Sequence, residues 1–264
     1  MNRSVYRVMM GVAGLAVLGM TGTLAGAQTV EVKGKPPLYR YESYWAFPRA
    51  HWADVDKDNV TRSQKVLAPA LADGTLVGYG DDENLVHHSP EGFTHDNWWQ
   101  ANSVAGLMKV IEALRKGGSS SSPLLVSATQ HWDQMFVSRF YHWKAGSWKG
   151  AYGYKATYKL KPDAPDTDDV MQTLSSFYVP VFEKMLADGT IVEYEIDREM
   201  YHNTDSRPHV LFVFLMPSAE GLDKFRVTLN AALSANPLIV PAFASMMVNF
   251  TPQSAYVRVN ATYK

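Results

Sequence analysis

The chain has 264 residues, of which 26 are acidic and 25 are lysine or arginine, so its formal net charge is −1. This balance, without a cluster of basic residues, predicts that neither nucleic acid nor an anionic membrane surface is a partner. The absence of cysteine excludes disulfides, thiolate catalysis and cysteine-ligated metal sites. With 46% hydrophobic residues, the chain is long enough to bury a sizeable core.

Residues 1–27 have the features of a signal peptide. Arg3 and Arg7 form a basic start, and residues 8–19 are an apolar run that is short for a membrane span. Ala25 and Ala27 are the small residues that signal peptidase requires, so we expect cleavage before Gln28. Residues 28–38 then form a flexible leader. The mature protein is therefore predicted to be exported, either periplasmic or secreted, without a membrane segment.

The elements of the first half follow from spacing and turn residues. Residues 39–52 are aromatic and extended in character, which predicts a strand. A helix begins at Asp54 or Asp56 and ends at the Asp73-Gly74 turn. Further strands are expected at residues 76–79, 95–101 and 135–143, with a helix that Ser103 caps between the last two.

The second half predicts the same succession. A strand is expected at residues 149–161, then a helix that ends at Gly189, then strands at 191–196 and 209–216. Ser218 caps the next helix, and residues 255–263 alternate as a final strand. Pro69 and Pro180 lie inside the long helices of the two halves and predict a kink or a broken turn in each.

The two halves are copies of one module. Residues 71–75 and 186–190 both read Leu-Ala-Asp-Gly-Thr, and matches at the same offset of 115 residues continue for about 40 positions further along the chain. We therefore predict module 1 at residues 39–148 and module 2 at 149–264. Each has the order β-α-β-β-α-β, the ferredoxin-like plan, which leaves one sheet face bare. Two such faces can close on each other, so the predicted fold class is α+β, two tandem modules in one pseudo-dimeric α/β barrel.

The same motifs carry a resemblance to a known superfamily. They are the Leu-Ala-Asp-Gly-Thr helix end, a Val-x-Tyr strand, an aromatic third strand and a Ser-x-x-Gly-Leu-x-Lys helix. This pattern resembles the dimeric α/β-barrel superfamily, which includes antibiotic-biosynthesis-monooxygenase-like, EthD-like and NIPSNAP-like proteins. The resemblance implies the barrel fold across residues 39–264. It implies no activity, because members range from cofactor-free oxygenases and haem enzymes to proteins of no known activity.

The copies have diverged most in their third strands. Residues 210–215 of module 2 are wholly apolar, whereas the aligned residues 95–100 read His-Asp-Asn-Trp-Trp-Gln. Buried polar groups need hydrogen bonds, water or a ligand. One hypothesis is therefore an aromatic-walled pocket in module 1, and the alternative is simply a more exposed strand. The residues assigned to this pocket and its polar neighbours are His87, His95, Asn97, Trp98, Trp99, His142 and Trp143.

A metal site and a haem site are two further hypotheses. The run His87-His88-x6-His95-Asp96 offers imidazole and carboxylate ligands, but its spacing is not a recognised metal motif, and hydrogen-bonded histidines are the favoured interpretation. No histidine stands out as a haem ligand. No cofactor is therefore predicted. Glu193, Glu195 and Asp197 alternate along one strand, either on its solvent face or inside the barrel with Lys155 or Arg258 as partners.

The first functional hypothesis is an exported protein that binds a small hydrophobic or aromatic molecule in the module 1 pocket. The second is a monooxygenase-like enzyme, cofactor-independent or less favourably dependent on haem or metal, in which His95 and His142 act as catalytic residues. The third is a structural barrel with no ligand. In each case we expect a monomer or a homodimer.

Overall fold

The computed structural model describes residues 32–86, 92–117, 122–162, 167–201, 209–248 and 253–264. The first half contains four strands and four α-helices. They are β1 (Leu38–Ala46), α1 (Trp52–Arg62), α2 (Ala68–Ala72), β2 (Gly78–Asn84), β3 (His95–Ala101), α3 (Val104–Lys116), α4 (Pro123–Val126) and β4 (Gln130–Trp143). The second half contains four strands and three α-helices. They are β5 (Gly146–Lys159), α5 (Thr167–Asp188), β6 (Glu193–Tyr201), β7 (His209–Met216), α6 (Ala219–Ala235), α7 (Ile239–Met246) and β8 (Gln253–Tyr263).

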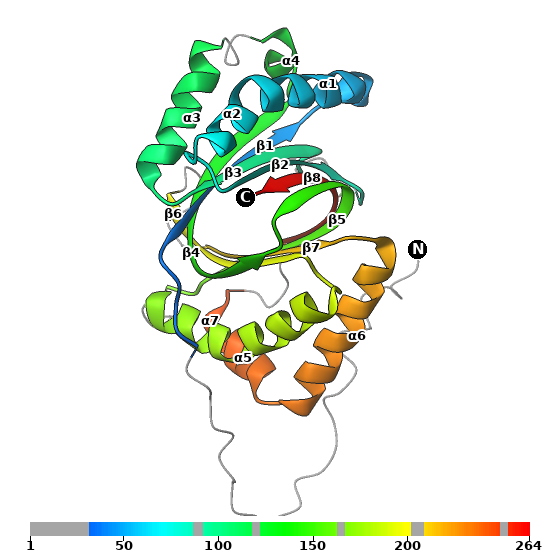
Figure 1. Ribbon diagram of the computed structural model, residues 1–264. Helices are drawn as coiled ribbons and strands as arrows, with labels where there is room; N and C mark the ends of the chain where they lie inside the picture. The colour runs from blue at the N-terminus through cyan, green and yellow to red at the C-terminus, as the bar shows by residue number, and fades with distance from the viewer. Residues whose placement is uncertain (1–31, 87–91, 118–121, 163–166, 202–208, 249–252) are drawn as a thin grey trace, which may run out of the picture. The chain divides into compact units, whose positions relative to one another are not determined.

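The eight strands form one closed antiparallel barrel, in the order β1-β3-β2-β8-β5-β7-β6-β4 (Figure 1). Each half contributes four adjacent strands, and the halves meet at two seams, β2 with β8 and β4 with β6. The prediction of an α+β fold with a closed barrel is confirmed. A single chain supplies every strand, so no second chain is needed to close the barrel.

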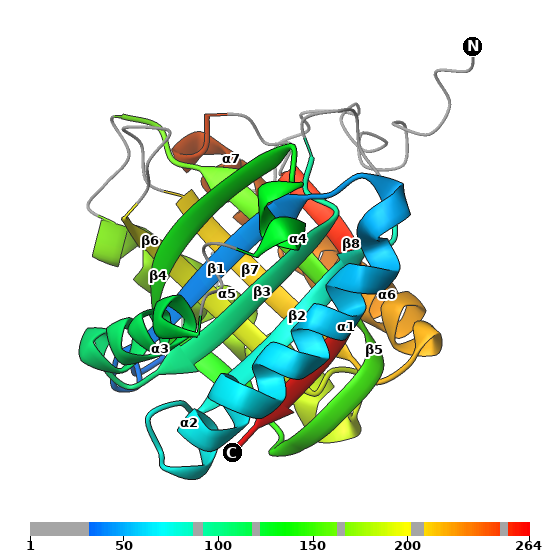
Figure 2. The ribbon, with the colours of Figure 1, turned by 90° about the horizontal axis from the view of Figure 1, so that it is seen from above.

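Helices pack against the outside of the barrel on two opposite sides (Figures 1 and 2). On one side, α3 presses Leu107 and Val110 against Trp99 of β3. On the other, α5 and α6 cover β6 and β7 with a larger cluster that includes Phe182, Phe214 and Phe225. Each of these helices buries its apolar face against the barrel.

The structure also shows where sequence patterns mislead. The strand expected at 39–52 ends at Ala46, and a 3₁₀ turn at Arg49–His51 leads into α1. The expected break at Pro69 takes the form of a π-helical turn at Ser63–Leu67, directly before α2. A π-turn relieves the missing N–H of proline without ending the helix. No broken turn occurs at Pro180, because α5 continues through it.

Strand bounds also differ in β2, β4 and β6. β4 begins at Gln130, five residues earlier than predicted. The third strands, His95–Ala101 and His209–Met216, have the predicted bounds. β2 and β6 begin two residues later than predicted and extend about five residues further. Within the described residues, no single helix has the length and hydropathy of a membrane span; α6 and α7 reach that composition only as a pair bent by 99°.

Candidate functional site: a polar groove beneath helix α1

The third strand of module 1 points its predicted site residues to opposite sides of the sheet. Side chains alternate along a strand, so His95, Asn97 and Trp99 face outwards whereas Trp98 faces into the barrel. Every residue of β3 is buried, so the alternative of a more exposed strand is wrong. The structure therefore does not bring these four side chains into one pocket wall.

The outward-facing residues pack under the helices. His95 is 2% exposed, and its ring meets the edge of Trp52 with centroids 5.5 Å apart. Asn97 donates to Asn59 Oδ1 at 3.0 Å and accepts from Arg62 Nη1 at 2.6 Å, which ties β3 to α1. Trp99 stacks on Tyr41 at 4.5 Å beneath α3.

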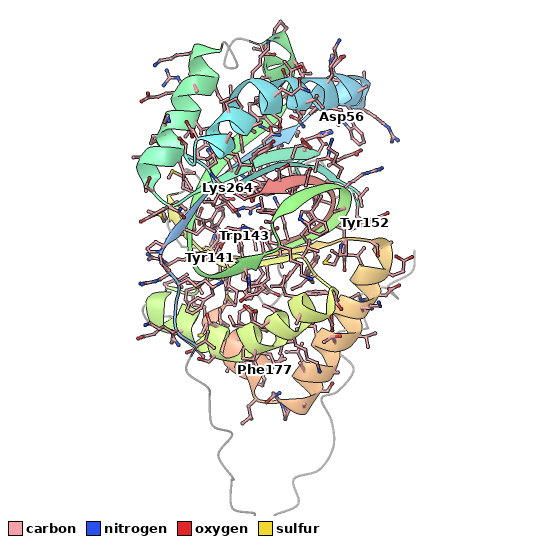
Figure 3. The ribbon with its side chains drawn as sticks, viewed as in Figure 1. Asp56, Tyr141, Trp143, Tyr152, Phe177 and Lys264 are labelled. Atoms are coloured by element: carbon pink, nitrogen blue, oxygen red, sulfur yellow. The ribbon has the colours of Figure 1, made fainter. Side chains whose placement is uncertain are left out.

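The remaining predicted residues lie elsewhere. His142 is on the outer face of β4 in contact with α5, where its Nδ1 lies 2.9 Å from Glu183 Oε1. Trp143 donates to the carbonyl oxygen of Lys264 at 3.1 Å and stacks on Tyr263, beside the last strand (Figure 3). His87 lies outside the described residues. His95 and His142 contact different helices, so the structure does not join them in one catalytic pair.

The barrel interior holds two buried cations among carboxylates. Lys155 Nζ lies 2.5 Å from Asp96, 2.7 Å from Asp82 and 2.9 Å from Glu42. Arg40 pairs with Glu42 at 2.5 Å and with Glu195 at 3.3 Å. All of these side chains are nearly inaccessible to solvent.

The predicted alternation of Glu193, Glu195 and Asp197 therefore places them inside the barrel. The solvent-face alternative is wrong, and the ion-pair partner of Glu193 and Glu195 is Arg40, not Lys155 or Arg258. Glu193 also accepts from the hydroxyl of Tyr263, and Glu195 from the side-chain amide of Gln100.

The interior carboxyl groups differ in the direction in which their pKa values are shifted. Burial opposes ionisation of Glu42, but Arg40 and Lys155 lower its pKa to about 2. Burial raises the pKa of Glu195 to about 8, with a further contribution from Asp197, and raises the pKa of Asp197 to about 7. Burial likewise raises the pKa of Asp96 well above its usual range. A raised pKa favours the neutral form of a carboxyl group, so Arg40 and Lys155 have less negative charge to balance.

Little space remains inside the barrel. The cavity beside Arg40, Trp98 and Lys155 has a volume of about 10 Å³, which is room for about one water molecule. Trp98 fills the centre because Gly80 has no side chain; a Cβ there would lie 2.5 Å from its ring. A hydrophobic or aromatic guest therefore does not fit beside Trp98.

A much larger groove lies outside the barrel, between α1 and the seam of β2 with β8. Its volume is about 410 Å³, within the size range of small-molecule sites. Residues from α1, β2, β3, β5 and β8 line it: Asp56, Asn59, Val60, Asp81, Asp82, Glu83, His95, Lys149, Gly150, Arg258 and Asn260. Figure 3 marks Asp56 on α1. The lining is mostly polar, and His95 is its only ring.

Hydrogen bonds fix the floor of this groove. Asn260 Nδ2 donates to Asp81 Oδ2 at 2.9 Å, while Asn260 Oδ1 accepts from the backbone N–H of Gly150 at 3.0 Å. Gly150 has φ +65° at a register shift in β5, a conformation that favours glycine. Burial and the neighbouring Asp82 raise the pKa of Asp81 to about 6. A carboxyl group with a raised pKa in a cleft is typical of functional sites.

The corresponding position in the second half is closed. Asp81 pairs with Asn260 across the β2–β8 seam, and at the repeat offset Ile196 pairs with Phe140 across the β4–β6 seam. Both apolar residues are buried in the core under α5. The groove is therefore a specific property of the first half of the chain.

Alignment of the two halves of the chain showed this asymmetry in the third strand. The second strand has the same asymmetry, which the sequence analysis did not use. Asp81-Asp82-Glu83 aligns with Ile196-Asp197-Arg198, so the same comparison could have singled out Asp81 and Glu83. The sequence gives no comparable indication for Arg258, Asn260 and Gly150. These residues reach the groove only through the long-range pairing of β8 with β2 and β5.

Metal binding gains no support from the geometry. His95 faces outwards and Asp96 inwards, so these two neighbours cannot coordinate one ion together. Among the residues that the structure describes, no group of three or more His, Asp or Glu side chains is suited to a metal ion. His87 and His88 lie outside that part of the chain.

Comparison with known proteins identifies the fold. No protein-family model matches the sequence, and curated protein sequences give no match. An anthrone oxidase-like protein superposes with a TM-score of 0.56 at 10% identity, covering 87% of this chain and 94% of its own. Two proteins provisionally named monooxygenases, from Fusobacterium nucleatum and Lactobacillus acidophilus, give TM-scores of 0.62 and 0.57 at 8% identity. Each covers 87% of this chain, with 95% and 97% of its own chain matched. At such identities the likeness shows the fold alone.

Proposed function

We propose that this protein binds a small polar molecule in the groove beneath α1. The observation that carries the proposal is the groove of about 410 Å³, lined by Asp81, His95 and Arg258 among others, on one half of a duplicated barrel. The packed counterpart in the other half supports it, because a groove required only for folding would be expected in both copies. The lining favours a polar ligand over the hydrophobic or aromatic one that the tryptophan content predicted.

A groove-filling variant tests this proposal. Val60 on α1 lines the groove and is 57% exposed, so Val60→Trp is expected to fill it without disturbing the core. Val227 on α6 is 69% exposed and lies outside the groove lining, so Val227→Trp is the matched control. Protein-observed NMR with a library of small polar molecules is expected to shift resonances of α1, β2 and β8. Binding should be lost in the Val60→Trp protein and kept in the control. Hits that map only to other surfaces, or equal binding by both variants, would contradict the proposal.

An oxygenase that needs no cofactor is the second candidate. The observation that favours it is the raised pKa of Asp81, about 6, because a general base works best when its pKa lies near the operating pH. Solved structures of similar fold include proteins named as monooxygenases and as anthrone oxidase-like. Oxygen uptake with anthrone that is lost in both Asp81→Asn and Val60→Trp would support this candidate. No uptake above the buffer rate would remove it for that substrate.

We also propose that each half is a ferredoxin-like module and that the pair arose by duplication. The support is the shared strand order, β4-β1-β3-β2 in one half and β8-β5-β7-β6 in the other, together with the repeated Leu-Ala-Asp-Gly-Thr segment. Export remains a proposal from Arg3, Arg7 and the Ala25-Gly26-Ala27 segment. Amino-terminal sequencing of secreted or periplasmic protein should begin at Gln28.

A further inference from the structure

The charges that line the groove are separated by sign. Asp56 on α1 and Asp81 and Glu83 on β2 supply carboxylates. Arg258 on β8 and Lys149 on β5 supply the cations. Because β8 lies between β2 and β5 in the barrel, the carboxylates of β2 form an acidic wall beside the basic wall that β8 and β5 form.

The side chains of Lys149 and Arg258 form no ion pair within the described residues. Glu83 and Arg258 are register partners across the seam, yet they form no ion pair within 4.0 Å. In the part of the chain that the structure describes, neither Lys149 nor Arg258 has a hydrogen-bond or ion-pair partner. The guanidinium of Arg258 lies instead over Gly150, where an added Cβ would be 3.3 Å from Nη2. The bulge at Gly150 therefore makes room for the cation on the β5 side.

An uncharged side chain connects the acidic and basic strands. Asn260 on β8 is held on both sides, by Asp81 of β2 and by the backbone of Gly150 of β5. A ligand with one charge would pair with either the acidic or the basic residues. Its apolar part would then lie against the unpaired charges of the other set. A ligand with both charges would satisfy both walls, and electrostatic complementarity of this kind sets specificity.

We propose that the groove selects a small zwitterion of the amino-acid class. Its ammonium group lies against Asp81 and the neighbouring carboxylates, and its carboxylate lies against Arg258, whose planar fork suits carboxylate oxygens. This inference rests on the proposed binding function and assigns its ligand class. The absence of aromatic rings other than His95 favours an aliphatic chain between the two charges.

Isothermal titration of the intact protein with a charge-matched set tests the assignment. Glycine, β-alanine and γ-aminobutyrate are the zwitterions, and butylamine and butyrate carry one charge each. At least one zwitterion is expected to bind about tenfold more tightly than either single-charge compound. Arg258→Gln should remove the tenfold gain in affinity and leave the affinity for butylamine unchanged. Asp81→Asn should also remove the gain, and leave the affinity for butyrate unchanged.

The outcomes separate this inference from the binding function itself. If no zwitterion binds more tightly than butylamine and butyrate, the ligand class is wrong. If uncharged polar molecules still bind in the groove and Val60→Trp abolishes their binding, the proposed function stands without it. Zwitterion binding that survives Val60→Trp would place the ligand outside the groove and overturn the assignment.

Discussion

Lys155 and Arg40 lie inside the barrel and connect its two halves through charge. Lys155 belongs to the second half, and its three carboxylate partners, Glu42, Asp82 and Asp96, all belong to the first. Arg40 belongs to the first half and pairs with Glu195 of the second. Each half thus supplies a cation to acidic side chains of the other, and Arg40 also pairs with Glu42 of its own half.

Replacing Lys155 tests this dependence. Lys155→Met keeps most of the side-chain volume but leaves buried carboxylates without their cation, which is expected to cost about 3–5 kcal/mol of unfolding free energy. Urea denaturation at neutral pH measures the change. Lys149→Met, on the same strand but exposed, is the control and should change stability by less than about 0.5 kcal/mol. A stability loss in Lys155→Met as small as in the control would show that the carboxylates take up protons at little cost.

The raised pKa values of Glu195 and Asp197 predict a pH dependence. Both groups hold protons in the folded state up to about pH 8 and about pH 7, whereas in the unfolded state they lose them near 4.5 and 3.8. Between those limits the folded state binds more protons, so the unfolding free energy falls as pH rises, by at most about 1.4 kcal/mol per pH unit for each group. Glu42 acts in the opposite sense, but only below its unfolded pKa of 4.5.

Urea denaturation at several pH values between 5 and 8.5 checks this prediction. The wild-type protein should lose stability steadily over the range, and the double variant Glu195→Gln, Asp197→Asn should have a shallower slope. Equal slopes would mean that other groups retain the protons.

At the scale of elements, the packing of Trp98 of β3 against β2 depends on Gly80. A Cβ on Gly80 would lie 2.5 Å from the ring of Trp98 and 2.8 Å from the carbonyl oxygen of Asn260, and that backbone atom cannot move easily. Gly80→Ala is therefore expected to cost about 1–3 kcal/mol through overpacking. Gly34→Ala, where the nearest contact would be 3.4 Å, is the control. Thermal unfolding compares the two, and similar melting temperatures would contradict the close-packing argument.

Strand bounds were predictable where the local sequence has a strand pattern, and they were not predictable in the glycine-containing β2. The apolar run of β7 and the mixed run of β3 have strand patterns bounded by turns, so their bounds were correct. β2 reads Gly78-Tyr79-Gly80-Asp81, and glycine and aspartate are unfavourable in strands by propensity. Tertiary packing against Trp98 outweighs that local preference, and no pattern within β2 reveals it.

The candidate site was predictable only in part. The difference between the third strands of the two halves drew attention to the first half, where His95 lines the groove. Alternation along β3 could have separated Trp98 from Asn97. The groove itself depends on Asp81 and Asn260, which are 179 residues apart and meet only because the barrel closes.

At the scale of the whole molecule, the two halves are predicted to be interdependent. A first half cut between β4 and β5 would expose the unpaired edges of β2 and β4 and an interior face with Glu42 and Asp96 lacking Lys155. Exposed strand edges favour association. We expect this half to dimerise or aggregate in size-exclusion chromatography with light scattering, and co-expression with the second half should restore a 1:1 complex. A monomeric first half with cooperative unfolding would contradict the single-barrel interpretation.

The β2–β8 seam also has a kinetic consequence. β8 is the last strand of the barrel along the chain, and it brings Arg258 and Asn260 to the groove. Pairing it with β2 closes a very long loop, and such long-range contacts form slowly. The groove should therefore be assembled in the final step of refolding, so that ligand capture and barrel closure proceed with one rate constant, and no earlier folding intermediate should be able to hold the ligand.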